Sequence, residues 1–293
     1  MEPFIGKLMK ATSDEQNAKQ TFSEALRNST CDDDAAVTLP HVEEVAREIY
    51  VDRFGHEVTV ITLLNESTPP ARVLLLDNFI SEEERHIMME RARPRLTAAT
   101  VNQDGDNQAL STYRRSQAAN VNANMYNESD PITRVSMRAF DLTNKYGGFD
   151  LNHHGQEPFS VIQYKDPATL RAEGKCFGDL CPGQQYRPHC DGACDGSPIM
   201  FGGRVATMLI YCQTAARGGG TTFTKANVHV VPKPGQAALF SYRGTDGTTD
   251  TGLTEHSGCP VKEGEKWVAT QWMREGVNTK ETWMLFDPQG GRL

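Results

Sequence analysis

The chain has 293 residues, of which 38% are hydrophobic and 23% charged, values ordinary for a soluble globular protein with one large domain and an appendage. Its formal net charge of −8 argues against a nucleic-acid partner, because binding to phosphates needs a basic surface. No run of eighteen apolar residues is present, so we expect no membrane span.

The first part of the chain has a helical character. Residues 13–28 are polar and helix-prone, and a second, amphipathic helix is predicted over 39–53, with Pro40 in its first turn. EVTVITLL at 57–64 predicts a strand. The following Thr-Pro-Pro at 68–70 predicts a linker.

After this linker the pattern becomes more regular. RVLLLDNFI at 72–80 predicts a buried strand, and Ser81 with Glu84 matches the capping box that opens a helix. Residues 97–120 are polar and contain few large apolar side chains, so a mobile loop is predicted there. A further helix is predicted over 131–146, because a proline suits its first position.

The second half of the chain consists of short strand-like segments that Gly and Pro separate. They lie at 159–164, 185–190, 204–212, 228–231, 236–241 and 267–273. Many short strands at this spacing favour a β-sandwich or barrel over a doubly wound sheet. We therefore expect a mainly β (α+β) domain with flanking helices at 71–293, preceded by a helical preface and linker at 1–70.

The seven cysteines are unevenly placed. They are Cys31, Cys176, Cys181, Cys190, Cys194, Cys212 and Cys259. Within the cluster at 176–194, the spacings C-x4-C, C-x8-C and C-x3-C differ from the paired C-x2-C of structural zinc sites. Disulfides in an oxidising compartment and free thiols both remain open.

The compartment is similarly open. The first residues, MEPFIGKLMKATSDEQ, lack the apolar core of a signal peptide. Sequons at Asn28, Asn65 and Asn127 fit secretion. We expect the endoplasmic reticulum lumen or secretory pathway if a signal peptide was removed, and the cytoplasm otherwise.

Three side chains suggest a metal site. His189 and Asp191, in YRPHCDG, lie two positions apart on a predicted strand, so both point to one face while Cys190 points away. With His256, in EHSGCPV, they would form the two-histidine, one-carboxylate triad of non-haem iron(II) oxygenases, which leaves coordination positions open. A surface histidine near an aspartate is the alternative reading of the H-x-D pair alone.

A lysine follows the second histidine. Lys266 precedes the predicted strand at 267–273, and its ammonium group could pair with the far carboxylate of a 2-oxo acid that chelates the metal. A solvated surface lysine is the alternative.

An ordered series of motifs resembles the catalytic domains of prolyl 4-hydroxylases. The segments are RRSQ, PGQQYRPHCDG, GGRVATMLIYC, GGGTTF, PKPGQAALFSY and EHSGCPVKEGEKWVATQWMRE. The resemblance extends from about residue 73 to 275. It implies a double-stranded β-helix (jelly-roll) core, iron(II) held by His189, Asp191 and His256, and Lys266 as the partner of 2-oxoglutarate.

The resemblance also implies roles for other residues. Tyr164 and Thr221 would contact 2-oxoglutarate. Candidate substrate-binding residues are Arg115, Tyr186 and Arg204, for which a solvated loop arginine, an ordinary core tyrosine and a structural ion pair are the respective alternatives.

The activity implied by the resemblance is hydroxylation of peptidyl proline, coupled to decarboxylation of 2-oxoglutarate to succinate. Ascorbate is implied as a further cofactor, and a proline-containing peptide or protein as the substrate. The alternatives are the same oxygenase chemistry on another side chain or a small molecule, and a catalytically silent peptide-binding jelly-roll. The oligomeric state is not predicted.

The chain departs from the family pattern in two places. Between Tyr164 and Gly183 it carries the insert KDPATLRAEGKCFGDLCP, and Gly220 stands where the family often has an acidic residue. Our hypothesis is that a disulfide clamps the insert beside the site, either Cys176–Cys181 or one of these two with a cysteine of the H-x-D segment. The chain also leaves no room for the separate peptide-binding domain of collagen-type enzymes, so procollagen is a doubtful substrate.

Other residues are assigned structural roles. His153 and His154 are expected to be a solvated pair in a loop, and His229 an outward-facing strand residue. Trp267 and Trp272 are expected to pack in the core.

Overall fold

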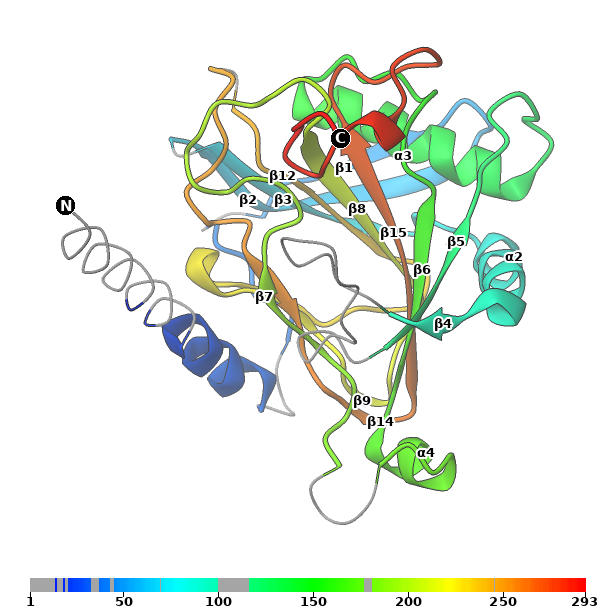
Figure 1. Cartoon of the computed structure of the whole chain (residues 1–293), viewed down its shortest axis with the longest axis vertical. Coiled ribbons are helices and arrows are strands. Elements are labelled where there is room, and N and C mark those ends of the chain that lie inside the picture. The colour runs from blue at the N-terminus through cyan, green and yellow to red at the C-terminus, as the bar shows by residue number, and fades with distance from the viewer. Residues whose placement is uncertain are drawn as a thin grey trace.

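The computed structural model describes residues 14, 18, 21–32, 37–42, 45–68, 70–99, 116–176, 181–244 and 246–293. Most of the ordered elements are antiparallel strands, and helices lie against one side of the largest sheet (Figure 1). No helix in these residues is both long and apolar enough to cross a membrane.

The strands of the major sheet are β1 (Arg47–Val51), β2 (Glu57–Ser67), β3 (Pro70–Asp77), β4 (Thr97–Ala98), β5 (Gln117–Val121), β6 (Phe159–Lys165), β8 (Arg204–Gln213), β12 (Ala237–Ser241) and β15 (Glu265–Arg274). The minor sheet contains β7 (Tyr186–His189), β10 (Thr221–Phe223), β11 (Val228–Val230) and β13 (His256–Gly258). A separate pair is formed by β9 (Arg217–Gly218) and β14 (Val261–Glu263). Residues 21–31 are helical. The labelled helices are α2 (Glu82–Ala92), α3 (Pro131–Gly147) and α4 (Pro167–Ala172), with short 3-10 turns η1 (Arg93–Arg95), η2 (Thr224–Ala226) and η3 (Trp283–Leu285).

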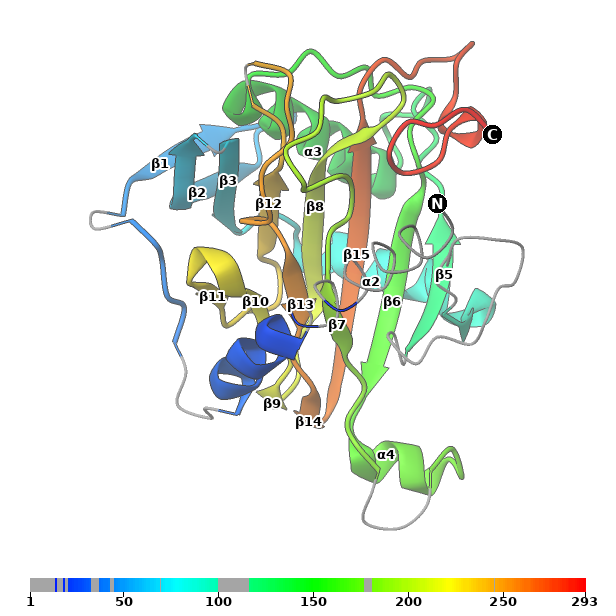
Figure 2. The same cartoon turned by 60° about the vertical axis from the view of Figure 1, so that its left-hand side comes forward.

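Within the described residues, the major sheet has the order β1-β2-β3-β12-β8-β15-β6-β5-β4, and the minor sheet the order β11-β10-β13-β7. Figure 2 shows the minor sheet in front of the central strands of the major sheet. Two facing antiparallel sheets connected in this way form the predicted jelly-roll, which is therefore confirmed.

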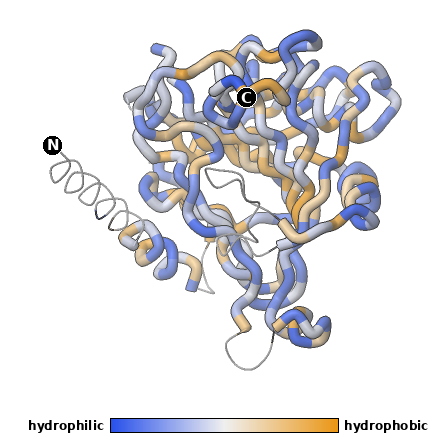
Figure 3. Tube along the Cα trace, viewed as in Figure 1, coloured by the Kyte–Doolittle hydropathy of each residue, from blue (hydrophilic) through white to orange (hydrophobic). Residues whose placement is uncertain are grey.

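The central strands separate two apolar layers. In β6, Phe159 and Val161 pack with the residues of α2 and α3, whereas Ile162 and Tyr164 pack between the two sheets. Side chains that alternate along a strand produce this division. Apolar colouring accordingly concentrates along the central strands in Figure 3. The layer between the sheets holds the candidate site.

The two helices predicted after residue 80 are confirmed. Ser81 caps α2 and forms the capping box with Glu84. Helix α3 starts at Pro131 behind the N-cap Asp130, and it ends at Gly148, whose φ of 69° suits a glycine.

An arginine of α3 joins three parts of the fold. Arg138, with 2% of its surface exposed, donates to Asp52 at 2.7 Å, to Glu84 at 3.0 and 3.2 Å, and to the carbonyl of Phe79 at 2.8 Å. Burial alone would raise the pKa values of both carboxyls, but other contacts hold them below their usual range. For Asp52 these are the hydrogen bond from the backbone amide of His56 and the contacts with Arg138, and for Glu84 mainly those with Arg138.

We predict that Arg138→Ala lowers the free energy of unfolding by about 3–5 kcal/mol, because it leaves two buried carboxylates unpaired. Urea denaturation measures the effect. Arg134→Ala on the same helix is the control and should cost less than about 1 kcal/mol. Equal stability of Arg138→Ala and the parent chain would contradict the prediction.

The helix predicted over 39–53 is wrong. Residues 47–51 form strand β1, which pairs antiparallel with β2. Ile49 and Val51 are 67% and 53% exposed, so the apolar pattern reflects no buried helix face. Pairing with a neighbouring strand overrides the local periodicity.

The prediction of a linker at 68–70 falls partly outside the described residues, since residue 69 is not among them. Its last residue, Pro70, stands opposite Ser67 in the β2–β3 pair. The strand predicted at 57–64 is confirmed and extends to Ser67. The division of the chain at residue 70 stays a prediction, and β2 and β3 pair across it.

The mobile loop predicted at 97–120 contains strands at both ends, since β4 pairs with β5 and β5 with β6. Residues 100–115 lie outside the described residues, and the candidate Arg115 lies among them. The six predicted strands of the second half are confirmed, whereas the shorter β9, β10, β13 and β14 were not predicted.

Candidate active site

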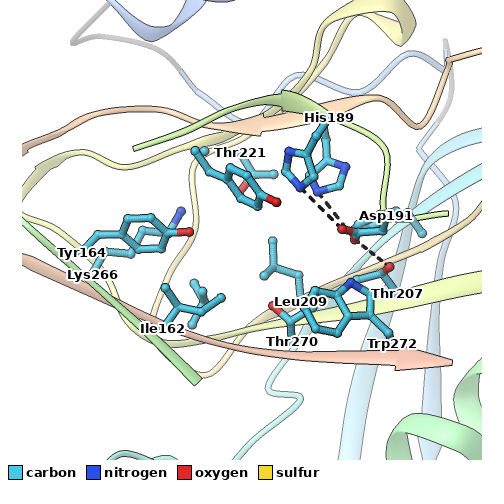
Figure 4. Close-up of a pocket in the computed structure, with 15 residues that line it drawn as sticks. Ile162, Tyr164, His189, Asp191, Thr207, Leu209, Thr221, Lys266, Thr270 and Trp272 are labelled. Carbon is cyan, nitrogen blue, oxygen red and sulfur yellow. Dashed lines mark hydrogen bonds and ion pairs between the residues drawn. The ribbon is translucent and has the colours of Figure 1, made fainter. Parts of the chain in front are cut away.

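The minor sheet brings the three predicted metal ligands together. His189 at the end of β7 is paired with His256 at the start of β13, and Asp191 follows β7. The ligand atoms of the three residues lie within 4.8 Å of one another. Asp191 Oδ1 is 3.5 Å from His189 Nε2, and Asp191 Oδ2 is 3.7 Å from His256 Nε2 (Figure 4).

Backbone carbonyls orient both imidazole rings. His189 Nδ1 lies 2.8 Å from the carbonyl of Arg187, and His256 Nδ1 lies 3.1 Å from that of Thr254. Because Nδ1 carries the proton in such a contact, Nε2 keeps its lone pair for a metal. Burial and the neighbouring His189 lower the pKa of His256 to about 4, so this ring is neutral at pH 7.

The carboxylate is buried and held from two sides. Asp191 accepts from Thr207 Oγ1 at 2.8 Å, and its backbone carbonyl accepts from Arg204 at 3.1 Å. Burial alone would raise the pKa of Asp191, but His256 and His189 hold it well below its usual range. Two imidazoles whose Nε2 atoms face one ionised carboxylate, on one side of a cavity, suit iron(II) with open coordination positions.

The opposite end of the same cavity holds a buried cation. Lys266 is 4% exposed, stands opposite Tyr164 in the β15–β6 pair, and donates to the carbonyl of Gly219 at 2.6 Å. Burial lowers the pKa of its ammonium group to about 7. The alternative of a solvated surface lysine is therefore wrong.

Two more predicted residues lie at this end. Tyr164 lies beside Lys266, whose Nζ is 6.0 Å from the tyrosine ring centre (Figure 4). Thr221 lines the cavity and accepts from the buried Tyr211 hydroxyl at 3.0 Å. A dicarboxylic acid with its 2-oxo end at the metal and its far carboxylate at Lys266 fits this arrangement.

Comparison with known proteins agrees with this geometry. The profile described as the 2OG-Fe(II) oxygenase superfamily matches residues 176–274, which include the three candidate ligands and the buried lysine. Residues 176–274 belong to the 2OG-Fe(II) oxygenase superfamily. We refer below to this part of the chain as the oxygenase region.

Proteins similar in sequence include prolyl 4-hydroxylase subunits. The chain is 32% identical over 211 residues to subunit alpha-1 of Rattus norvegicus, 33% over 218 residues to that of Gallus gallus, and 32% over 211 residues to subunit alpha-3 of Homo sapiens. These matches cover 70%, 72% and 69% of this chain and 34%, 37% and 34% of the relatives. The chain thus spans about a third of their length, and the resemblance inferred from the motifs is confirmed.

Among solved structures, the viral collagen prolyl hydroxylase of Paramecium bursaria Chlorella virus-1, in complex with 2OG, has a similar fold. The TM-score is 0.50 at 21% sequence identity, and the match covers 69% of this chain and 96% of that one. This likeness supports the jelly-roll assignment alone.

The candidate substrate residues of the oxygenase region have different surroundings. The Tyr186 ring stacks on His189 at a centroid distance of 3.6 Å and lines the cavity. Arg204 makes two 2.7 Å hydrogen bonds to Glu157 and lies 3.9 Å from the ring centre of Trp272. The ion-pair alternative therefore describes Arg204, which also supports the backbone of Asp191.

Sequence reasoning misplaced two aromatic residues. Trp267 packs in the helix-side core as predicted, but Trp272 lines the active-site cavity. His229, expected to face outward, is 5% exposed. A Cβ atom at Gly220 would lie 2.6 Å from its ring, so this glycine leaves room for the imidazole.

Six cysteines form disulfides. Cys176 pairs with Cys181, which is the first of the pairings considered in the hypothesis, and the bond joins two residues five positions apart within the insert. That it clamps the insert beside the site stays a hypothesis. Cys190–Cys194 closes the loop that contains Asp191, and Cys31–Cys259 joins the helical residues 21–31 to the segment after His256. Cys212 is free and buried, and burial raises its pKa to about 12.

We predict that the double variant Cys190→Ser/Cys194→Ser loses about 2 kcal/mol of unfolding free energy, since a short loop is no longer closed. Its iron(II) affinity should also fall, because this loop carries one ligand. The double variant Cys176→Ser/Cys181→Ser is the control: it should lose stability but keep its metal affinity. Calorimetric titration of both proteins with metal distinguishes the two, and equal metal affinities would refute the prediction.

Proposed function

We propose that the chain is an iron(II)- and 2-oxoglutarate-dependent dioxygenase that hydroxylates proline residues in peptides. One observation carries the proposal: His189, Asp191 and His256 occupy one end of a cavity whose other end holds the buried Lys266. The names of the relatives support proline as the target.

Each residue has a task in the proposed reaction. Iron(II), held by the triad, supplies the oxidation chemistry when it is bound. Lys266 pairs with the far carboxylate of 2-oxoglutarate and orients it, while Thr207 and Arg204 keep Asp191 in place. One dioxygen and one 2-oxoglutarate are consumed, and succinate, carbon dioxide and one hydroxylated residue are formed. Ascorbate belongs to the proposal by resemblance.

The test is a hydroxylation assay. Proline-containing peptides are incubated with the protein, iron(II), 2-oxoglutarate and dioxygen, and mass spectrometry locates any added oxygen atom. We expect oxygen on proline together with an equal amount of succinate, and neither product from His189→Ala. Oxygen on another residue would indicate a different target, and a metal-loaded protein that forms no succinate would be a silent binding module.

We also propose that the protein folds in an oxidising compartment of the secretory pathway. Three disulfides support this, as do exposed side chains at Asn28, Asn65 and Asn127, each in a sequon. Glycan mapping of protein from its native host tests the proposal, and unmodified asparagines with free thiols would contradict it.

A further inference from the structure

Two further hollows lie beside the active-site cavity. Trp272 lines both this cavity and a second hollow beside β4, β5 and β6. Glu157, Pro158 and Trp283 line both the second hollow and a third, outer one. The shared residues place the three hollows next to one another, and we refer to them together as the groove. The outer hollow is lined by residues just before β6 and by Gln271 of β15.

The outer hollow is polar but nearly uncharged. Among its described lining residues, Glu157 is the only Asp, Glu, Lys or Arg. Its carboxylate accepts from Arg204 at 2.7 Å and from Arg274 at 2.6 Å, so the charge is compensated within the protein. A neutral ligand suits this surface better than an ionic one.

One wall offers amides and aromatic rings. Asn120, Asn122 and Asn124 are exposed lining residues at the end of β5 and in the loop after it, and their side-chain amides offer hydrogen-bond donors and acceptors. Tyr126, which is 81% exposed, follows these residues, and its ring lies 5.0 Å from that of His154. An extended main chain could bond to the amides while its side chains contact the rings.

The opposite wall is pre-formed. The Trp283 amide donates to the carbonyl of Gly155 at 2.8 Å, and a Cβ atom at Gly155 would lie 2.0 Å from the carbonyl oxygen of Asn278. The Gln156 side chain bonds both the amide and the carbonyl of Arg274, at 2.7 and 2.9 Å. A wall fixed in this way loses little conformational entropy when a ligand binds.

We propose that this groove binds the extended part of the substrate that flanks the target proline, with Trp283 and Tyr126 as its main contacts. The inference rests on the proposed function and extends it to a binding site remote from the metal. Proline-rich segments suit the outer hollow because they are uncharged, already extended and bound by aromatic rings in other proteins. A small-molecule substrate would not reach the outer hollow.

The test compares two peptides, a proline-containing tripeptide and a proline-rich peptide of about fifteen residues that includes it. Calorimetry measures their binding to the anaerobic protein loaded with iron(II) and 2-oxoglutarate, which prevents turnover. We expect Trp283→Ala and Tyr126→Ala to weaken binding of the long peptide about tenfold and that of the tripeptide less than about twofold. Trp283→Phe and Tyr126→Phe should retain most of the affinity, and Phe22→Ala, a change at another exposed aromatic residue, should have no effect.

Two results would overturn the groove proposal: a long peptide that binds the parent protein no more tightly than the tripeptide, or alanine variants that weaken both peptides equally. Admission of dioxygen then tests the reaction separately. Selective loss of long-peptide binding without any hydroxylation would support the groove and refute the proposed function. If the protein hydroxylates proline but both alanine variants keep the kcat/KM of the parent for the long peptide, the proposed function is supported and the groove is refuted.

Discussion

Replacement of His256 by Ala is expected to abolish turnover and to weaken iron(II) binding by more than about a hundredfold. The estimate is a lower bound, because loss of a residue that only orients a metal ligand can already reduce metal affinity by up to about a hundredfold. His256 contributes one of three donor atoms, and its Nε2 faces Asp191 at 3.7 Å. Metal affinity measured under anaerobic conditions reports the change without relying on activity.

The matched control is His86→Ala, which removes an exposed imidazole from α2, outside the site. It should leave both affinity and turnover unchanged. If His256→Ala bound iron(II) as tightly as the parent chain, the metal would be held elsewhere and the assignment of the triad would be wrong.

Replacement of Lys266 by Ala is expected to weaken 2-oxoglutarate binding roughly 30-fold or more, equivalent to at least about 2 kcal/mol for loss of one partner of a buried charge pair. The ammonium group is 4% exposed and lies at the end of the cavity opposite the metal ligands (Figure 4). Titration of the metal-loaded protein with 2-oxoglutarate measures the loss. Lys233→Ala, at an exposed position, is the control and should bind as the parent does.

The same lysine predicts a pH dependence. Burial lowers its pKa to about 7, so without 2-oxoglutarate the Lys266 amine is mostly protonated below pH 7 and mostly neutral above it. Because the dicarboxylate binds the protonated form, its affinity should be constant below pH 7 and fall by up to about tenfold for each pH unit above it. Lys266→Arg keeps its charge and should remove this dependence. Affinity that rose between pH 7 and 9 in the parent chain would contradict the assignment.

The local part of the site was predictable from the sequence, and the long-range part was not. Alternation along a strand predicted that His189 and Asp191 point to one place, and they do meet, although Asp191 lies in the bend after β7. Their meeting with His256 depends on the register of β7 against β13, which no local pattern specifies. His256 was therefore a candidate only by residue type, and the motif resemblance supported it as the third ligand.

The alternation of side chains along β15 also distinguishes its two tryptophans. Trp267 and Trp272 are an odd number of positions apart on β15, so they must face opposite sides of the sheet. One packs against the helices and the other lines the cavity. Ordinary hydrophobicity suggested core packing for both, and it could not distinguish the two layers.

Tertiary contacts decided the remaining cases. The segment at 47–51 has a helical pattern but pairs with β2, and His229 is buried because Gly220 leaves space for its ring. The pairing of Cys31 with Cys259 joins residues far apart in the chain, and connectivity of this kind does not follow from spacing.

The structure of crystals grown anaerobically with iron(II) and 2-oxoglutarate tests the site most directly, because anomalous scattering at the iron absorption edge locates the metal. We predict one anomalous peak in the oxygenase region, at the position where His189, Asp191 and His256 coordinate the iron. The far carboxylate of 2-oxoglutarate should contact Lys266. An iron peak away from these three side chains, or a 2-oxoglutarate molecule turned away from the lysine, would contradict the proposed function.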